Sequence, residues 1–266
     1  MLVVSHERRL NPDLARDANG AYVVPPGTPL VELTLSQVKA YDVGQLRPDS
    51  AYAKQFPEQR AVSGTPIPTL KEVIDLVRRS GNTKVRLNIE TKIDPGHPSE
   101  SPDPDKFVTL LLGALDAEHF GDRAMIQSFD WRTLQLVQQR APKIPTVYLT
   151  LQRGKQPTVS LETATDWTAG FSPATYGGSL PSTIHAAGGA IWSPYFADVT
   201  PALVSEAHDL KLQVVVWTVN KPDDIARMID MGVDGVISDR PDLLRKVAGE
   251  KGVVESSGLL LKPSSK

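Results

Sequence analysis

Apolar positions recur along the chain in two alternating patterns. Short apolar runs without strict alternation are typical of strands buried on both faces, and stretches with apolar residues three or four positions apart are typical of amphipathic helices. The strands are predicted at residues 85–90, 124–129, 146–150, 190–193, 213–219 and 233–238. Because these strands alternate with helices, the pattern predicts an α/β chain with a parallel sheet covered by helices.

Helix-start signals support this assignment. Thr69 and Glu72 have the spacing of a capping box before a helix that is predicted to end near Arg79. Asp130 is suited to cap the helix after the second strand, and the pair Thr200-Pro201 has the cap-then-proline order of another helix start. Further helices are predicted near residues 36–41, at 105–118, after Asn220 and Pro222, and at 241–247.

Two architectures fit this order of elements, an open doubly wound sheet and a TIM (β/α)8-type barrel. The glycine-rich turn that binds dinucleotides follows none of the predicted strands, which disfavours a nucleotide-binding doubly wound fold. A complete barrel needs eight strands. The sequence predicts six, together with an isolated β-type run at Met1–Ser5. Either the sheet is open, or strands are missing upstream.

The chain is predicted to form one barrel domain over residues 1–248, with an irregular insertion at about 11–68 that is rich in Pro, Gly, Asp and Asn. Residues 249–266 mix Gly, Ser, Lys and Pro, and are predicted to be a flexible tail.

Composition narrows the possible partners. The 266 residues carry 29 Lys and Arg against 31 Asp and Glu, a net charge of -2, so there is no global basic field for nucleic acid. No apolar run approaches the roughly 18 residues of a membrane span, so stable membrane insertion is not expected. The absence of cysteine excludes disulfides and thiol nucleophiles. Because the chain has no global basic field, a phosphate-containing substrate would need local basic groups.

One strand end concentrates polar side chains. Asn88, Glu90 and Lys92 fall on one face at the two-residue period of a strand. The functional interpretation is a metal-binding carboxylate beside a phosphate-binding amine. The structural alternative is an internal salt bridge in the lower barrel.

Two further positions could take part in catalysis or substrate binding. His6 directly follows the Met1–Ser5 run, where a general acid or base would project from a strand end. Trp217 ends a later strand, and its side chain is interpreted either as part of the core packing or as an aromatic wall beside a substrate. For Ser128 a helix-start hydrogen bond is expected, whereas Asp234 and Asp239 fit turn or site roles equally. The remaining histidines are expected at the surface.

These residues belong to a larger set of segments that occur in the order of one known family. The chain resembles the glycerophosphodiester phosphodiesterase family from about Val3 to Val247. The segments that carry this resemblance are Val3-Val4-Ser5-His6-Glu7 with Leu10, Ile67-Pro68-Thr69-Leu70-Lys71-Glu72-Val73, Leu87-Asn88-Ile89-Glu90-Thr91-Lys92, Gln127-Ser128-Phe129, Val216-Trp217-Thr218-Val219-Asn220, and Gly232-Val233-Asp234-Gly235-Val236-Ile237-Ser238-Asp239-Arg240-Pro241.

The resemblance implies a TIM barrel that hydrolyses glycerophosphodiesters, as small-molecule substrates, to glycerol 3-phosphate and an alcohol. It implies a divalent cation, Ca²⁺ or Mg²⁺, held by carboxylates, and two histidines that transfer protons. By position, Glu90 matches a metal ligand, Lys92 a phosphate-binding lysine, His6 the second histidine, and Trp217 an aromatic residue on the glycerol side. Glu7 stands where the family usually has aspartate.

The chain departs from the family at its start. The family opens with a strand ending in His-Arg-Gly, a Pro-Glu-Asn-Thr helix start and a strand bearing Glu-x-Asp, and none of these precedes His6. The first strand, first helix and second strand are therefore predicted to be missing, with the first histidine and two metal carboxylates. Little or no activity is expected from this chain.

Three alternatives stay open at this stage. One is a degenerate barrel that binds a phosphorylated ligand without catalysis, another is a gene fragment, and the third is a lyase that uses Lys92 as a Schiff-base amine. The compartment is undetermined: periplasmic or secreted if a signal peptide lies upstream, and otherwise cytoplasmic.

Overall fold

The computed structural model describes residues 1–253; residues 254–266, which hold most of the predicted tail, lie outside the described residues. The chain divides into two compact units. Unit 1 comprises Met1–Gly81 and Lys92–Glu118, and unit 2 comprises Asn82–Thr91 and the chain from His119 onward.

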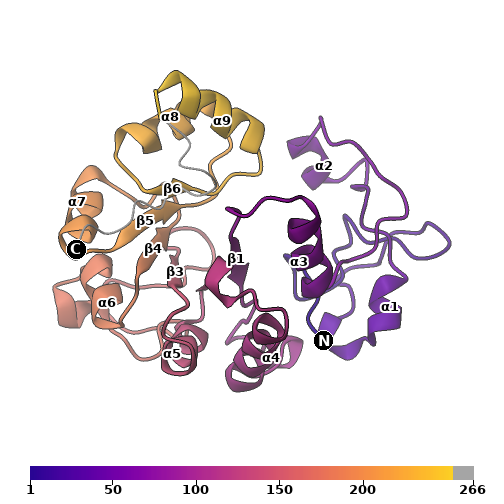
Figure 1. Cartoon of the computed structure of the whole chain (residues 1–266), viewed down its shortest axis with the longest axis horizontal. Helices are drawn as coiled ribbons and strands as arrows, with labels where there is room; N and C mark the ends of the chain where they lie inside the picture. The colour runs from indigo at the N-terminus through magenta and orange to yellow at the C-terminus, as the bar shows by residue number, and fades with distance from the viewer. Residues whose placement is uncertain (254–266) are drawn as a thin grey trace. The chain divides into compact units, whose positions relative to one another are not determined.

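Unit 2 is built on one parallel sheet of six strands, as predicted (Figure 1). Each strand overlaps a predicted range. The strands are β1 (Leu87–Glu90), β2 (Ala124–Ser128), β3 (Thr146–Thr150), β4 (Ile191–Pro194), β5 (Gln213–Val216) and β6 (Gly235–Val236). The pairing places Leu87 beside Ala124 and Val147 beside Ile191, so the carboxyl ends of neighbouring strands meet at one edge of the sheet.

The order of the strands decides between the two predicted architectures. The spatial order β1-β2-β3-β4-β5-β6 follows the chain without reversal. A doubly wound sheet reverses its order at a switch point, whereas consecutive parallel pairing with a helix between strands is the arrangement of (β/α) barrels. Within residues 1–253, β1 and β6 are the edge strands of this sheet.

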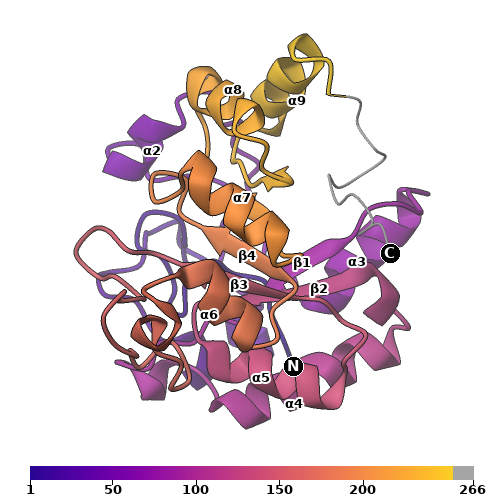
Figure 2. The ribbon, with the colours of Figure 1, turned by 90° about the vertical axis from the view of Figure 1, so that its left-hand side faces the viewer.

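Five helices of unit 2 follow the strands, and Figures 1 and 2 place α5, α6 and α7 along the same face of the sheet. Their starts bear out the predicted caps, because Asp130 accepts the Arg132 N–H and Thr200 accepts the Leu203 N–H. These helices are α5 (Trp131–Arg140), α6 (Leu180–Ala186), α7 (Pro201–Asp209), α8 (Pro222–Asp230) and α9 (Pro241–Glu250). Helix α9 continues past the predicted domain boundary and includes the first two residues of the predicted tail. Within residues 1–253, no helix has the length and apolar character to cross a membrane.

The unit 2 core lies on both faces of the sheet. One cluster joins Met125, Val147, Ile191 and Val215 from four successive strands. Large side chains including Trp131, Tyr148 and Trp192 are also fully buried. Two short 3-10 helices, Gly121–Arg123 and Pro173–Tyr176, complete the unit.

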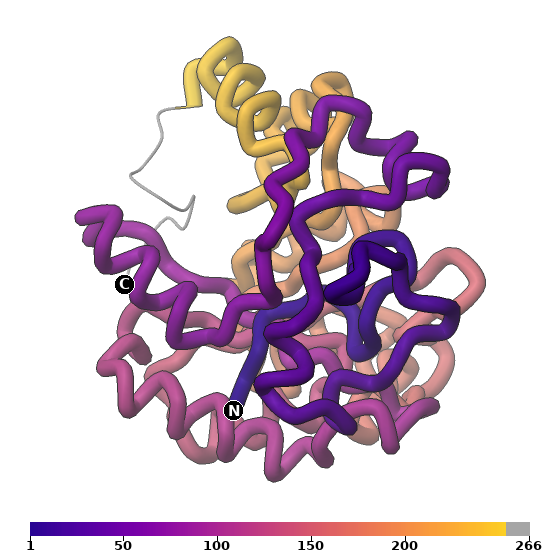
Figure 3. Tube along the Cα trace, turned by 90° about the vertical axis from the view of Figure 1, so that its right-hand side faces the viewer, coloured from indigo at the N-terminus to yellow at the C-terminus, as the bar shows by residue number. Residues whose placement is uncertain are grey.

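Unit 1 contains the irregular segment predicted at 11–68, whose loops Figure 3 traces in indigo and purple. Its longest helices are α3, which ends at the predicted residue and carries the predicted capping box of Thr69 and Glu72, and α4. Helix α2 was not predicted. The helices are α1 (Leu35–Lys39), α2 (Ala51–Gln55), α3 (Leu70–Arg79) and α4 (Pro104–Ala117), with 3-10 turns at Leu30–Glu32 and Pro98–Glu100.

The apolar run at Met1–Ser5 does not form a strand of the sheet, which corrects the β-type interpretation of this segment. Val3 makes a single antiparallel bridge with Thr69, and backbone hydrogen bonds join Val4 to Pro68 and Leu70 to Leu2. The run pairs with the residues that lead into α3, and this pairing gives the Val4 N–H and the Leu2 carbonyl their hydrogen-bond partners.

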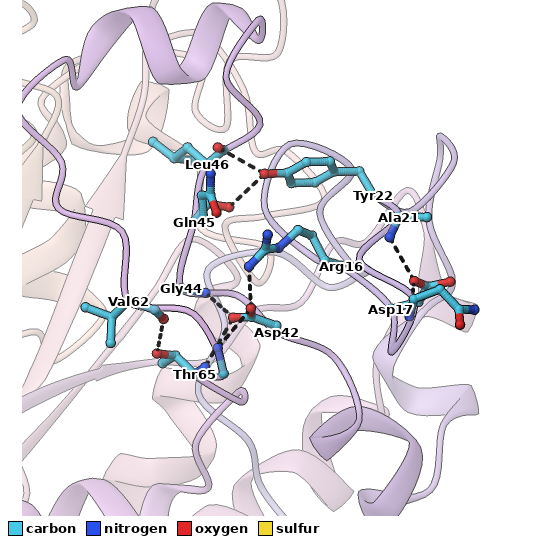
Figure 4. A network of polar contacts seen from close by, with 12 residues as sticks. Arg16, Asp17, Ala21, Tyr22, Asp42, Gly44, Gln45, Leu46, Val62 and Thr65 are labelled. Carbon is cyan, nitrogen blue, oxygen red and sulfur yellow. Dashed lines mark hydrogen bonds and ion pairs between the residues drawn. The ribbon is translucent and has the colours of Figure 1, made fainter.

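Asp42 ties the loops of the irregular segment together (Figure 4). Its carboxylate accepts backbone N–H groups of Gly44, Gly64 and Thr65 at 2.9, 3.0 and 3.2 Å, and the Arg16 guanidinium at 2.5 Å. The backbone hydrogen bonds from Gly64 and Gly44, and then the Arg16 contact, hold the pKa of Asp42 well below its usual range. The ionised carboxylate therefore substitutes for regular secondary structure.

The substitution Asp42→Asn should lower the free energy of unfolding by roughly 1–3 kcal/mol at pH 7, since it removes charge-assisted hydrogen bonds. The folded pKa lies below the unfolded value of about 3.9, so the contribution of Asp42 is present above that value and declines as the pH falls through the folded pKa. Urea unfolding of both proteins at neutral and acidic pH measures this. Asp49→Asn, at an exposed position, is the matched control. A difference that is independent of pH would contradict the assignment.

Candidate active site

His6 and Lys92 come together within unit 1, although 85 residues separate them in the sequence. Nε2 of His6 lies 3.2 Å from Nζ of Lys92, and Nδ1 of His6 lies 2.8 Å from Oε1 of Glu7. The His6 side chain is 79% exposed, so its ring is accessible to a ligand. A carboxylate, an imidazole and an ammonium therefore form a short row at the surface of unit 1.

The charge of Glu7 is stabilised by this row. The hydrogen bond from His6 is the main cause that lowers the pKa of Glu7, and the positive charges of Lys92 and Arg8 act in the same direction. An ionised Glu7 favours the tautomer of His6 with its proton on Nδ1, which leaves Nε2 as an acceptor toward the Lys92 ammonium.

Two arginines beside the row are committed to carboxylates. Arg8 donates to Asp94 at 2.9 Å and to Glu100 at 3.0 Å, and Arg9 donates to Glu100 at 2.7 Å. Burial acts to raise the pKa of Glu100, but the hydrogen bonds from Arg9 and Arg8 outweigh it and lower the value. The pair Arg8–Asp94 joins the segment after His6 to the segment after Lys92. This ion pair thereby keeps the backbone segments that carry His6 and Lys92 next to each other.

The predicted strand-end group is divided between the two units. Asn88 and Glu90 share one face of β1 in unit 2, and the Asn88 amide donates to Gln127 of β2 at 2.7 Å. Lys92 begins the second segment of unit 1, where it contacts His6. The salt-bridge alternative and the metal-site interpretation of Glu90 both stay predictions.

The described residues do not form the site that a hard divalent cation needs. Within neither unit, over residues 1–253, do three His, Asp or Glu side chains gather as possible ligands. Ca²⁺ takes six or more oxygen ligands, and Mg²⁺ is octahedral. Glu90 could supply one carboxylate, so the Ca²⁺ or Mg²⁺ cofactor stays a prediction.

Trp217 is packed among other side chains, as one of its two interpretations predicts. It follows β5, its Nε1 donates to the Ser193 carbonyl at 2.9 Å, and it is partly exposed. Its ring contacts Phe129 at 5.3 Å and Tyr195 at 5.4 Å between centroids. Packing thus holds the ring at the carboxyl end of the sheet, and contact of its exposed part with a substrate stays a prediction.

Ser128 has the structural role that its sequence predicts. Its buried hydroxyl donates to the Thr91 carbonyl at 3.2 Å and accepts the Asp130 N–H at 3.1 Å. A third hydrogen bond, buried and 2.8 Å long, joins the hydroxyls of Thr91 and Thr133. These bonds connect the ends of β1 and β2 to the start of α5.

The two aspartates around β6 differ in environment. Asp234 precedes the strand and accepts the Val214 N–H and the His208 ring, each at 2.8 Å, which is a structural role. Asp239 follows the strand and accepts from the Asn220 amide at 2.9 Å. Asn220 was expected at the start of α8; instead Lys221 precedes the helix, and Asn220 joins the ends of β5 and β6.

Several groups were missed by sequence reasoning. Tyr195 and Phe196 directly follow β4 and come shortly after the strand predicted at 190–193, so their position could have marked them. Trp167 lies in an irregular segment that offers no such signal. Asp94 and Glu100 were missed because ion pairs with Arg8 and Arg9 are contacts between distant parts of the chain.

Sequential parallel strands, with polar and aromatic side chains at their carboxyl ends, place unit 2 in the class of (β/α)-barrel proteins. The model of the glycerophosphoryl diester phosphodiesterase family matches residues 1–243. The chain belongs to this family, whose members are phosphoric diester hydrolases acting on glycerophosphodiesters.

Individual relatives agree with this assignment. A glycerophosphodiester phosphodiesterase of Caldanaerobacter subterraneus subsp. tengcongensis is 26% identical over 255 residues, covering 94% of this chain and 82% of the relative. A solved structure from Silicibacter pomeroyi DSS-3, whose name is "Putative glycerophosphoryl diester phosphodiesterase", is 34% identical with a TM-score of 0.80. The match covers 94% of this chain and 79% of that chain. An Oleispira antarctica phosphodiesterase, solved with its product sn-glycerol-3-phosphate, shares the fold at 17% identity and a TM-score of 0.63. The match covers 93% of this chain and 79% of that chain.

Ser128→Ala should lower the free energy of unfolding by about 1–3 kcal/mol, because it leaves the buried Thr91 carbonyl and Asp130 N–H without their partner. Affinity for glycerol 3-phosphate should be unchanged if Ser128 is structural only. Thermal unfolding and calorimetric titration measure the two quantities. Reduced affinity at unchanged stability would place Ser128 in the site instead.

Proposed function

We propose that this chain binds glycerophosphodiesters with their phosphate at Lys92 and hydrolyses them to glycerol 3-phosphate and an alcohol with His6 as the proton-transfer group. The observation that carries the proposal is the position of the His6 ring between the Glu7 carboxylate and the Lys92 ammonium.

Phosphate binding would change the partner of His6. An ammonium prefers an anionic phosphate oxygen to a neutral ring nitrogen as acceptor, because charge-assisted hydrogen bonds are stronger. When Lys92 donates to phosphate, Nε2 of His6 is released to hold or move a proton, while Glu7 keeps the ring oriented through Nδ1.

Hydrolysis balances with one water. Its oxygen bonds to phosphorus, the bond between phosphorus and the alcohol oxygen breaks, and one proton of the water ends on the alcohol. His6 would transfer protons at Nε2. Glycerol 3-phosphate as a ligand is supported by its presence as the product in the Oleispira antarctica phosphodiesterase.

Metal dependence is the part of the family chemistry that the described residues fit least. When bound, a divalent cation would polarise the phosphoryl oxygens. Since no group of three ligands forms within either unit of residues 1–253, we assign no step to the cation. We propose that hydrolysis by this chain is slow for the same reason. In the limiting case the chain is a degenerate barrel that binds the phosphorylated ligand without turnover.

Lys92→Met should weaken binding of glycerol 3-phosphate by about tenfold or more, which corresponds to the roughly 1.5–3 kcal/mol of a hydrogen bond between charged groups. Isothermal titration calorimetry of the wild type and the variant measures the change. Lys84→Met, which removes an exposed lysine elsewhere, should leave the affinity unchanged. Equal affinity in all three proteins would refute phosphate binding at Lys92.

Release of glycerol 3-phosphate from glycerophosphocholine by the purified chain should stay close to background with millimolar Ca²⁺ or Mg²⁺, and His6→Gln should abolish what remains. A coupled assay with and without a chelator measures it. Fast, chelator-sensitive release would show that the chain assembles a working metal site, and would overturn the proposal of slow hydrolysis without affecting the binding result.

A further inference from the structure

An apolar cavity opens beside His6 in unit 1, and its volume is about 160 Å³. His6 itself forms part of the wall. The hydrocarbon part of the wall consists of Val4, Leu10, Leu14, Ala15, Val43 and Ile67. The space next to the proposed proton-transfer group is therefore bounded mainly by aliphatic side chains.

The apolar cavity is a gap in the small core of unit 1. Leu10, Ala15 and Ile67 are buried members of one apolar cluster, and the partly buried Val43 packs against it. Protein interiors are close-packed, and side chains that line a void lose the dispersion contacts that neighbouring atoms would provide. A hydrocarbon ligand would restore those contacts. Val4, which is 45% exposed, lies where the wall meets solvent.

The polar groups of the wall have partners within the fold. The Ser5 hydroxyl donates to the Glu7 carbonyl at 3.0 Å, and Oδ1 of Asn11 accepts the Asp13 N–H at 2.8 Å. Arg9 donates to a carboxylate and to a backbone carbonyl. A buried water needs about two to four polar partners, whereas an apolar cavity of about 150 Å³ stays dry and binds benzene. The apolar cavity therefore has room for a hydrocarbon group of about six carbon atoms.

Charged side chains border a second cavity, whose volume is about 280 Å³. Glu7, Arg8 and Glu100 line this charged cavity, and Leu10 lines both cavities. Because His6 and Glu7 are in contact at 2.8 Å, the two cavities adjoin at the proposed site. A phosphodiester has one arm on each side of its phosphate. The polar glycerol arm can form hydrogen bonds in the charged cavity, which leaves the apolar cavity for an arm of hydrocarbon.

We infer that the apolar cavity binds the hydrocarbon part of the substrate's alcohol, and that the chain prefers glycerophosphodiesters of an alkyl or aryl alcohol with about six carbon atoms. This inference rests on the proposed function, which places the phosphate at Lys92 beside His6. The ionisable residues of the cavity wall are His6 and Arg9, which carry no negative charge at any pH. An alcohol with an ammonium group would therefore be buried there without a counter-ion, at a large cost in free energy.

A homologous series of glycerol 3-phosphate alkyl esters tests this preference by isothermal titration calorimetry. From the methyl to the hexyl ester, each added methylene should tighten binding about two- to fourfold, because it moves apolar surface from water into the cavity. The octyl and decyl esters should gain nothing further, since the cavity is then full. The longer esters are measured below the concentration at which they form micelles.

Two substitutions in the wall should change this series in opposite ways. Val43→Phe fills the cavity, so the affinity of the hexyl ester relative to the methyl ester should fall about tenfold or more. Val62→Phe, the same substitution at an exposed position of unit 1, is the matched control and should keep the wild-type series. Ile67→Val enlarges the cavity and should move the plateau to a longer ester. Circular dichroism and thermal unfolding confirm that each variant is folded, and Ile67→Val keeps the test available if Val43→Phe is not.

Equal affinities from the methyl to the hexyl ester would overturn the inference, as would a gain that Val43→Phe leaves unchanged. Affinity that keeps rising through the decyl ester would assign the alkyl group to an open apolar surface and would also overturn it. Failure here is separable from failure of the proposed function, because glycerol 3-phosphate carries no alkyl arm. Its binding tests the role of Lys92 alone, and the gain per methylene tests the cavity alone.

Discussion

The parallel pairing of six strands in sequential order is the constraint on which unit 2 depends. It places the residues after β2, β4 and β5 at one edge of the sheet. Phe129, Tyr195 and Trp217 meet there because each follows its own strand, although no two of them are close in the sequence. A shift of one residue in register would turn these side chains to the opposite face, since side chains alternate along a strand.

Unit 1 is held together by a small apolar cluster and by polar contacts instead of a regular sheet. Its irregular segment buries a small cluster of Leu10, Ala15, Val38 and Ile67. Polar groups hold much of the remaining backbone: Asp42 binds three backbone N–H groups, and Glu100 bridges Arg8 and Arg9. Such ion pairs have defined geometry and partners, and they orient His6 beside Lys92 more specifically than apolar contacts would.

The arrangement separates structural polar groups from those available to a ligand. Ser128, Thr91 and Thr133 are buried, with hydrogen bonds among themselves and to the backbone. His6 is largely exposed, and its ring contacts groups that can exchange partners, a carboxylate and an ammonium. Burial thus distinguishes polar residues with a structural role from those available to a ligand, because a buried polar group must find its hydrogen-bond partners within the fold.

The sequence by itself determined the α/β class, the number and order of the strands and the capping box at Thr69, because these follow from local periodicity and from contacts between near neighbours. It also indicated His6, Glu90, Lys92 and Trp217 through motifs. Only the tertiary structure decided which strands are neighbours in the sheet, the pairing of Met1–Ser5 with the segment before α3, the contact of His6 with Lys92, and the ring contacts of Trp217. Those features join residues far apart in the chain, and local patterns carry no information about which distant partner a side chain will contact.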